Sequence, residues 1–298
     1  MDRILADLDG WKADGEIPAK HVESIRSRIG YVLTTIHGKL RAVTQPIFHA
    51  SQSDDALVQW NPDLEVMRAF LHTLFTSAHL PPRRFDITPR ANDLSHVLEY
   101  TDSNGKGELG LVMIDLASRP PLKLYASAVI PPWFMDIVRL SDKLVWINQF
   151  EAFAVVVADL TFARYTAGRR VYHFVDNIAA LGAIVNGYSG KPELAALVNL
   201  TSLFCVRNRT LKFYEYVQSA ANCSDLPSRP RPCPQHQDEA LWTSEERDAI
   251  RAWDLKYAHQ WSACFHDMRF LSPDEVILPS REDFFDPVGV LSRSLGPV

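Results

Sequence analysis

The sequence has few cysteines, no excess of positive charge and no long apolar run. Its 298 residues include 4 cysteines that lie far apart and form no CxxC pair: Cys205, Cys223, Cys233 and Cys264. This spacing argues against a disulfide framework and favours reduced thiols, so we expect an intracellular protein, cytoplasmic or nuclear. A zinc site built from the CPQH and CFH stretches (233–236 and 264–266) would fit no common finger spacing.

The net charge of -5 provides no overall positive field that would recruit nucleic acid or an anionic membrane. This balance argues against a free-standing, tight nucleic-acid binder, but not against an enzyme whose substrate is held by a neighbouring domain. The longest apolar stretch, AFAVVVADLTFA (152–163), is too short to span a membrane and contains Asp159. The first residues, MDRILADLDGWKADGE, are acidic where a signal peptide would be basic, so no targeting segment and no membrane partner are expected.

Residues 1–92 have the pattern of a helical segment. A set of apolar residues recurs at helical spacing, comprising Val22, Ile25, Ile29, Val32, Leu33 and Ile36. A second helix is predicted over 61–80, with Asn61-Pro62 as its start signal and LPPRR as its stop. Both patterns are typical of a small helical bundle whose basic face is solvated.

From about residue 95 the pattern changes to that of an α/β domain, over 93–230. Apolar runs at 95–102, 108–116 and 121–130 are separated by turn signals, which predicts a three-stranded antiparallel meander. A helix at 144–167, a strand at 169–177, a helix at 192–208 and a strand at 211–217 follow. This order indicates a mixed sheet flanked by helices. Residues 231–298 form a partly helical C-terminal extension, with Thr243 and Glu246 placed as a capping box.

Acidic residues stand at the ends of several of these elements. Asp102 ends the first strand and Asp176 ends the fourth, so parallel neighbouring strands would deliver both carboxylates to one edge of the sheet. Glu151 lies near the start of the long helix, and Asp225 follows the last strand by a short loop. Carboxylates packed together repel one another unless they bind cations. The four acids therefore predict a site for two Mg²⁺ or Mn²⁺ ions, the arrangement used for phosphodiester hydrolysis.

Each acid also has a simpler interpretation as a turn, cap or solvated residue. Four further acids lack a comparable placement at a strand end and are predicted to be surface charges: Asp115, Asp136, Asp142 and Asp159. Agreement of the four site acids with one sheet topology is what favours a shared site over four separate surface roles.

Four ordered blocks carry a resemblance to a known family: YTDSNGKGELG, INQFEAFAVVVAD, HFVDNIAALGAIVNGYS and SAANCSDLPSRP. Together they resemble the ribonuclease H-like domain of retroelement reverse transcriptases, especially the DIRS-like branch. The resemblance covers about residues 95–230. The helices before it resemble, more loosely, the thumb or connection region of such polymerases.

The resemblance implies a mixed five-stranded sheet that cuts the RNA strand of an RNA/DNA hybrid. It implies that Asp102, Glu151, Asp176 and Asp225 hold the two divalent ions and are the catalytic acids. It also places a set of polar residues near the substrate, comprising Ser103, Asn104, Asn177 and Asn222. No YxDD-type polymerase motif appears in the sequence, so polymerase fingers and palm would have to act as a partner, in cis or in trans.

The sequence departs from the family pattern at several positions, one of which is the Cys-Ser of ANCSDLPSR, where Val-Ala or Pro-Ala is usual. TDSN replaces the commoner TDAS, and Ser219 stands where cellular ribonucleases H carry a loop histidine, which predicts slow turnover or dependence on a partner.

Two other functions stay open. One alternative is a non-catalytic, domesticated retroelement fragment that binds nucleic acid or protein. Another keeps the fold but cuts DNA junctions or trims strand ends.

Overall fold

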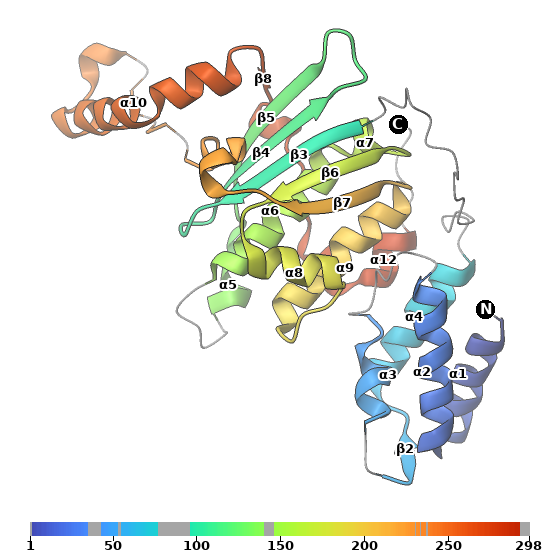
Figure 1. Ribbon diagram of the computed structural model, residues 1–298. Helices are drawn as coiled ribbons and strands as arrows, with labels where there is room; N and C mark the ends of the chain where they lie inside the picture. Colours follow the sequence, from blue (N-terminus) through green and yellow to red (C-terminus); the bar gives the residue numbers. More distant parts are fainter. Residues whose placement is uncertain are drawn as a thin grey trace.

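The computed structural model describes residues 2–34, 43–52, 55–76, 96–139, 146–229, 231–232, 234–236 and 238–292 (Figure 1). Ile36, Asp142 and Cys233, which appear in the predictions above, lie outside these residues, as does the predicted domain boundary at 92–93. The described chain is an α/β structure with a mixed six-stranded sheet flanked by helices. This architecture confirms the α/β class that the sequence predicts.

The N-terminal segment is helical, with one small sheet. Its elements are α1 (Asp2–Asp14), β1 (Glu16–Pro18), α2 (Ala19–Thr34), α3 (Gln45–Ala50), β2 (Leu57–Gln59) and α4 (Pro62–Thr76). The apolar stripe of α2 is buried as predicted, at Val22, Ile25, Ile29 and Leu33. The indole Nε1 of Trp11 donates to the carbonyl of Val58 at 3.0 Å, which ties α1 to the β1–β2 pair.

The large sheet has the strand order β7-β6-β3-β4-β5-β8. Its strands are β3 (His96–Ser103), β4 (Glu108–Asp115), β5 (Leu122–Val129), β6 (Arg170–Val175), β7 (Leu211–Tyr216) and β8 (Arg269–Phe270). The predicted meander is present, because β4 is antiparallel to both β3 and β5. β6 is parallel to β3, and β7 is parallel to β6, so all three end at the same edge of the sheet.

The prediction of a five-stranded sheet was wrong, because the sheet has a sixth strand, β8, at its edge. β8 comes from the C-terminal extension and pairs with β5 through only two residues, Arg269 and Phe270. So short a strand has no alternating pattern of its own, and its pairing depends on a chain that returns from far away in the sequence. The C-terminal extension therefore completes the sheet instead of forming a separate tail.

Helices α6 (Ile147–Thr161), α8 (Ile178–Asn186) and α9 (Pro192–Arg207) cover one face of the sheet, as Figure 1 shows. α6 is buried along almost its whole length, which explains its nearly continuous apolar sequence. The helix predicted over 144–167 is divided, because α6 ends before Phe162 and the short α7 (Ala163–Thr166) follows. α8 was not predicted as a separate helix. It begins at the N-cap Asn177 and ends at Gly187, whose φ of 67° is left-handed.

The opposite face of the sheet is covered in part by the chain after β7 and by α10 (Ser244–Phe265). Val112 of β4 packs there against Leu226, Tyr257 and Phe265 in a second, smaller core. The predicted capping box of α10 is present, with Thr243 and Glu246 bonded reciprocally. α10 then extends away from the sheet (Figure 1).

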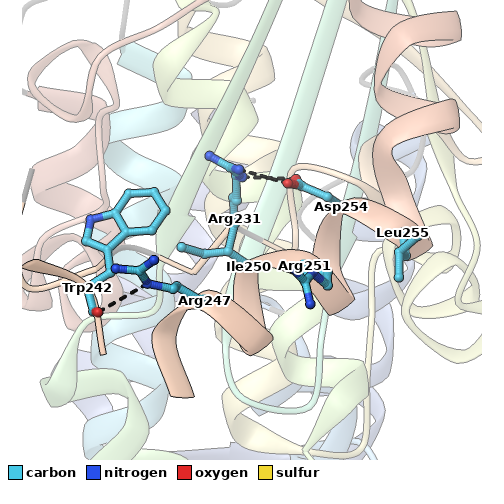
Figure 2. A pocket seen from close by; sticks show the side chains of 7 residues that line it. All are labelled: Arg231, Trp242, Arg247, Ile250, Arg251, Asp254 and Leu255. Carbon is cyan, nitrogen blue, oxygen red and sulfur yellow. Dashed lines mark hydrogen bonds and ion pairs between the residues drawn. The ribbon is translucent and has the colours of Figure 1, made fainter. Parts of the chain in front are cut away.

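The exposed part of α10 carries a shallow hollow of about 440 Å³ with three arginines and a tryptophan (Figure 2). Within it, Arg231 is held by Asp254 through two bonds of 3.1 and 2.9 Å. Arg247 donates to the carbonyl of Trp242 at 3.3 Å. The hollow is lined by α10 and by residues of the segment before it, and Asp254 is its only acidic lining residue among those described.

The remaining C-terminal elements connect the parts of the molecule. α5 (Pro132–Arg139) follows β5, and α11 (Arg281–Phe285) and α12 (Pro287–Ser292) end the described chain. α12 packs against both α9 and α4, so it joins the N-terminal helices to the α/β body. Among the residues that the structure describes, no helix combines the length and apolar character required to cross a membrane.

Candidate metal centre

The parallel pairing of β3 with β6 brings two acids to one edge of the sheet. Thr101 pairs with Val175 in the register of the two strands, so the following residues, Asp102 and Asp176, lie side by side at this end of the strands. α6 starts near the same edge and carries Glu151 in its second turn. One carboxylate oxygen from each of the three acids lies within 4.8 Å of the other two.

Burial makes this cluster electrostatically unfavourable without a cation. Glu151 is 3% exposed and Asp102 is 5% exposed. Burial, together with the charges of Asp102 and Asp176, raises the pKa of Glu151 to about 9, although the backbone N–H of Ser103 donates to Glu151 Oε1 at 3.2 Å. Burial also raises the pKa of Asp102 to about 6, against the opposing effect of a hydrogen bond from the hydroxyl of Ser228.

One atom of the cluster lacks any partner among the described residues. Glu151 Oε2 is buried and accepts no hydrogen bond. A buried carboxylate oxygen without a donor is unfavourable, and a bound cation would satisfy it. The donor set is composed entirely of carboxylate oxygens, which suits Mg²⁺ or Mn²⁺ and not zinc. The residues present therefore fit a hard divalent ion held by Asp102, Glu151 and Asp176.

Asp225, the fourth predicted acid, lies near this cluster but does not belong to it. It ends a short 3-10 turn, η2 (Cys223–Asp225), after β7. Its charge raises the pKa of both Asp102 and Glu151, so it lies within electrostatic range. Its Oδ1, however, accepts from Arg229 Nε at 3.0 Å and from the terminal guanidinium nitrogen at 2.6 Å. The structure thus brings three of the four predicted acids together and pairs the fourth with an arginine.

The segment 222–229 is fixed to the sheet by hydrogen bonds from several directions. Asn222 Nδ2 donates to the carbonyl of Thr101 at 3.1 Å. The hydroxyl of Ser127 donates to the carbonyl of Pro227 at 2.7 Å. Ser228 donates to Asp102, and its own carbonyl accepts from Asn104 Nδ2 at 2.7 Å. Because these bonds join the segment to β3, β5 and the turn after β3, the segment sets the position of Asp225 relative to the three clustered acids.

This close packing requires a glycine at position 110, which pairs with Asp102 across β3 and β4. A Cβ on Gly110 would lie 2.0 Å from the carbonyl oxygen of Ser224 and 2.5 Å from the backbone nitrogen of Ser228. We expect Gly110→Ala to lower the free energy of unfolding by about 3 kcal/mol, because a backbone segment must move to admit the methyl group.

Urea denaturation of Gly110→Ala beside Gly182→Ala checks this expectation. Gly182 lies within α8 and has open space around its Cβ position, so its replacement is expected to stabilise the protein by up to about 1 kcal/mol. A Gly110→Ala protein as stable as the parent would show that segment 222–229 does not rest on β4 as described.

The residues predicted to contact substrate have partners within the protein. Ser103 Oγ donates to the carbonyl of Glu108 at 3.3 Å, and Asn104 closes the turn between β3 and β4 through its own side chain. Asn177 caps α8 by accepting from the N–H of Ala180 at 2.9 Å. Asn222 is buried and holds η2 against β3. Their side chains therefore shape the site, and direct contact with a substrate stays a prediction.

Two polar residues beside the acids were missed by the sequence reasoning. Asn148 and Gln149 line a cavity of about 330 Å³ together with Asn186 and Lys191. Asn148 Oδ1 accepts from Asn177 Nδ2 at 3.0 Å, which places this cavity next to Asp176. Gln149 is only 3% exposed. The signal was present in the sequence, since both amides precede Glu151 in the first turn of the same helix.

Two acids predicted to be surface charges are buried. Asp115 forms two bonds of 2.7 Å with Arg169, and these bonds lower its pKa to about 2. Asp159 is buried on α6 and forms an ion pair with Lys212 of β7. The prediction was wrong for both because their partners are remote in the sequence. Asp136 is exposed as predicted.

Lys212 belongs to a buried polar cluster formed by the strands β7, β6 and β3 and by helix α6. Its ammonium group also contacts Glu99 of β3, and Glu99 Oε2 lies 2.8 Å from Nδ1 of His173 on β6. Burial alone would raise the pKa of Glu99, but Lys212 and His173 outweigh it and lower the pKa. Burial raises the pKa of Asp159, and Lys212 only partly offsets this. We name this set, Glu99, Asp159, His173 and Lys212, the central cluster.

Comparisons with known proteins assign no family to this arrangement. No protein-family model matches the chain, and no curated protein matches it. The geometry of the acids and the resemblance of the four sequence blocks are therefore what indicates a function.

Proposed function

We propose that this chain cuts the RNA strand of RNA/DNA hybrids by metal-dependent hydrolysis, as the ribonuclease H part of a retroelement reverse transcriptase. The observation that carries the proposal is the meeting of Asp102, Glu151 and Asp176, with a buried, unpartnered oxygen on Glu151. The mixed sheet, with its meander and two further parallel strands, is compatible with a ribonuclease H-like fold.

Each acid has a defined part in this proposal. Asp102, Glu151 and Asp176 would hold one divalent ion, and Asp225 would contribute to a second. Such ions lower the pKa of a water molecule and stabilise the leaving oxygen in phosphodiester hydrolysis. The protein itself supplies a rigid frame, since Ser103 N–H orients Glu151 and the hydroxyl of Ser228 orients Asp102.

Selection of RNA requires contacts with the 2′-hydroxyl group, which donates and accepts hydrogen bonds. The cavity next to Asp176 offers suitable groups in the amides of Asn148 and Gln149. Main-chain groups near Ser103, whose own N–H donates to Glu151, are a second candidate for such contacts. A polymerase domain in cis or in trans would deliver the hybrid, since the net charge of -5 provides little attraction for it.

One observation favours the alternative of a non-catalytic binding module. The charge of Asp225 is already balanced by Arg229, which donates to its Oδ1, so this carboxylate attracts a second ion less than a free one would. In that case the sheet and helices would serve as a scaffold for a partner protein or nucleic acid.

Cleavage of a labelled RNA/DNA hybrid distinguishes these functions. The protein is incubated with Mg²⁺, with Mn²⁺ and with EDTA, beside Asp102→Asn and the surface control Asp136→Asn. We expect metal-dependent cutting of the RNA strand that is lost in Asp102→Asn and kept in Asp136→Asn. Equal cutting of a DNA duplex would point to a DNA nuclease, and no cutting with either metal would favour the binding module.

A further inference from the structure

Arg229 has a bonding pattern that connects Asp225 to the C-terminal extension. Its guanidinium group donates twice to Asp225 Oδ1, at 3.0 and 2.6 Å. The remaining terminal nitrogen donates to the hydroxyl of Tyr257 at 3.2 Å, and the guanidinium carbon lies 5.9 Å from the centre of the Tyr257 ring. Arg229 therefore joins an acid of the candidate site to a residue of α10.

α10 also holds the backbone of Arg229. The indole Nε1 of Trp253 donates to the carbonyl of Arg229 at 2.8 Å. Trp253 and Tyr257 are four residues apart, so they lie on the same face of the helix. Tyr257 is 9% exposed and packs in the core beneath the open face of the sheet. The backbone carbonyl and the guanidinium group of Arg229 are thus both bonded to one face of α10.

A cation and Arg229 would compete for the same carboxylate. Arg229 donates both bonds to the same oxygen, Oδ1, and hydrogen bonds between ionised groups are charge-assisted and strong. Asp225 is partly exposed, while the three clustered acids already form a set that fits one ion without it. The first ion therefore needs no change at Asp225, whereas a second ion at Asp225 would meet a carboxylate whose charge is already balanced and whose Oδ1 is already bonded to the guanidinium group.

We propose that Arg229 is a positioning residue that competes with the second divalent ion for Asp225, and that α10 strengthens this competition through Tyr257 and Trp253. This inference depends on the metal centre of the proposed function. It gives the C-terminal extension a defined effect: α10 weakens the binding of the second ion and leaves the first unaffected. Any partner that shifts α10 would then strengthen the second site.

Titration of the full chain with Mn²⁺, followed by electron paramagnetic resonance and calorimetry, tests the inference by counting ions and measuring the affinity of each. We expect one tight and one weak ion in the parent. Arg229→Gln is expected to tighten the second ion about tenfold, since a charge-assisted bond is lost. Tyr257→Phe is expected to produce a smaller change in the same direction. The affinity for the first ion should stay the same.

Matched variants separate this effect from a general change in charge. Arg231→Gln also removes an arginine from an ion pair with an aspartate, on the surface of α10 (Figure 2), and should leave both ions unaffected. The double variant Asp225→Asn/Arg229→Gln should bind Mn²⁺ in the same way as Asp225→Asn alone. A general field effect would persist in that double variant and would overturn the proposal.

The remaining outcomes are also decisive. A first ion that binds normally, with a second ion unchanged in both Arg229→Gln and Tyr257→Phe, overturns this inference but leaves the metal centre intact. Absence of any Mn²⁺ binding in the parent and in Arg229→Gln overturns the metal centre and the inference together. Thermal unfolding of each variant shows whether it is folded, and Tyr257→Phe provides the test if Arg229→Gln does not fold.

Discussion

Replacement of Glu151 by glutamine is expected to stabilise the metal-free protein by roughly 3 kcal/mol at pH 8. The pKa of Glu151 is raised from an ordinary value of 4.5 to about 9, mainly by burial. At pH 8 the side chain must therefore take up a proton when the protein folds, and this uptake costs free energy. Glutamine has nearly the same shape, carries no charge and needs no proton.

The direction of the pH dependence follows from this shift. The pKa of Glu151 is higher in the folded protein than in the unfolded chain. Its contribution to the free energy of unfolding is therefore fully present below pH 4.5 and is lost as the pH rises toward 9. Asp102 acts in the same direction between its ordinary pKa of 3.8 and about 6. The parent in EDTA should therefore lose stability from pH 5 to pH 9, and Glu151→Gln should show a much smaller loss.

Chemical denaturation in EDTA at pH 5, 7 and 9 measures both effects, with Glu99→Gln as the matched control. Glu99 is equally buried but is paired with Lys212 and His173, so its replacement should destabilise the protein. Mg²⁺ should stabilise the parent, since it binds only the folded state, and should have no effect on Glu151→Gln. If Glu151→Gln is less stable than the parent at pH 8 in EDTA, Glu151 is held by partners other than a metal.

Loss of Lys212 is expected to cost about 3–5 kcal/mol of stability at pH 7, because Lys212→Met leaves charged groups buried without a counter-ion. The ammonium group lies between Glu99 and Asp159, and both acids together raise its pKa despite full burial. Without it, the two carboxylates can avoid a buried charge only by taking up protons. The deficit should therefore shrink as the pH falls toward 5.

Equilibrium unfolding at pH 5 and pH 7 measures the loss, with Lys106→Met as a control at an exposed turn. Lys106→Met should have little effect. Asp159→Asn in the Lys212→Met background should recover part of the loss, because it removes one of the two uncompensated carboxylates. A Lys212→Met protein that matches the parent at both pH values would show that the central cluster is neutral without its lysine.

The parts of the fold that were predictable depend on local signals. The turn Ser103-Asn104-Gly105 separates two apolar runs of strand length, so β3 and β4 could be predicted from a short stretch of sequence. The capping box of α10 is equally local. β8 could not be predicted, since its two residues acquire their strand geometry only by pairing with β5. α8 was missed although Asn177 and Gly187, its N-cap and C-cap residues, are ordinary helix boundary signals.

The candidate site likewise has parts that the sequence could predict and parts that it could not. The strand ends that carry Asp102 and Asp176, and the helix that carries Glu151, follow from the order of elements, so their meeting could be anticipated. The pairing of Asp225 with Arg229 could not, because it depends on the path of an irregular segment. Burial of Asp159 was equally hidden, since its partner Lys212 lies on β7, which is remote from α6 in the sequence.

The central cluster also limits how the sheet can assemble. Glu99 and Lys212 are 113 positions apart, on strands separated by β6. If β7 slipped by one residue, the lysine would turn to the opposite face and Phe213 would take its place beside two acids. A sheet with β7 in a shifted register would thus bury charge without compensation and would be less stable than the native pairing. The cluster therefore favours the native register of β7, a strand that pairs in parallel with a strand remote from it in the sequence.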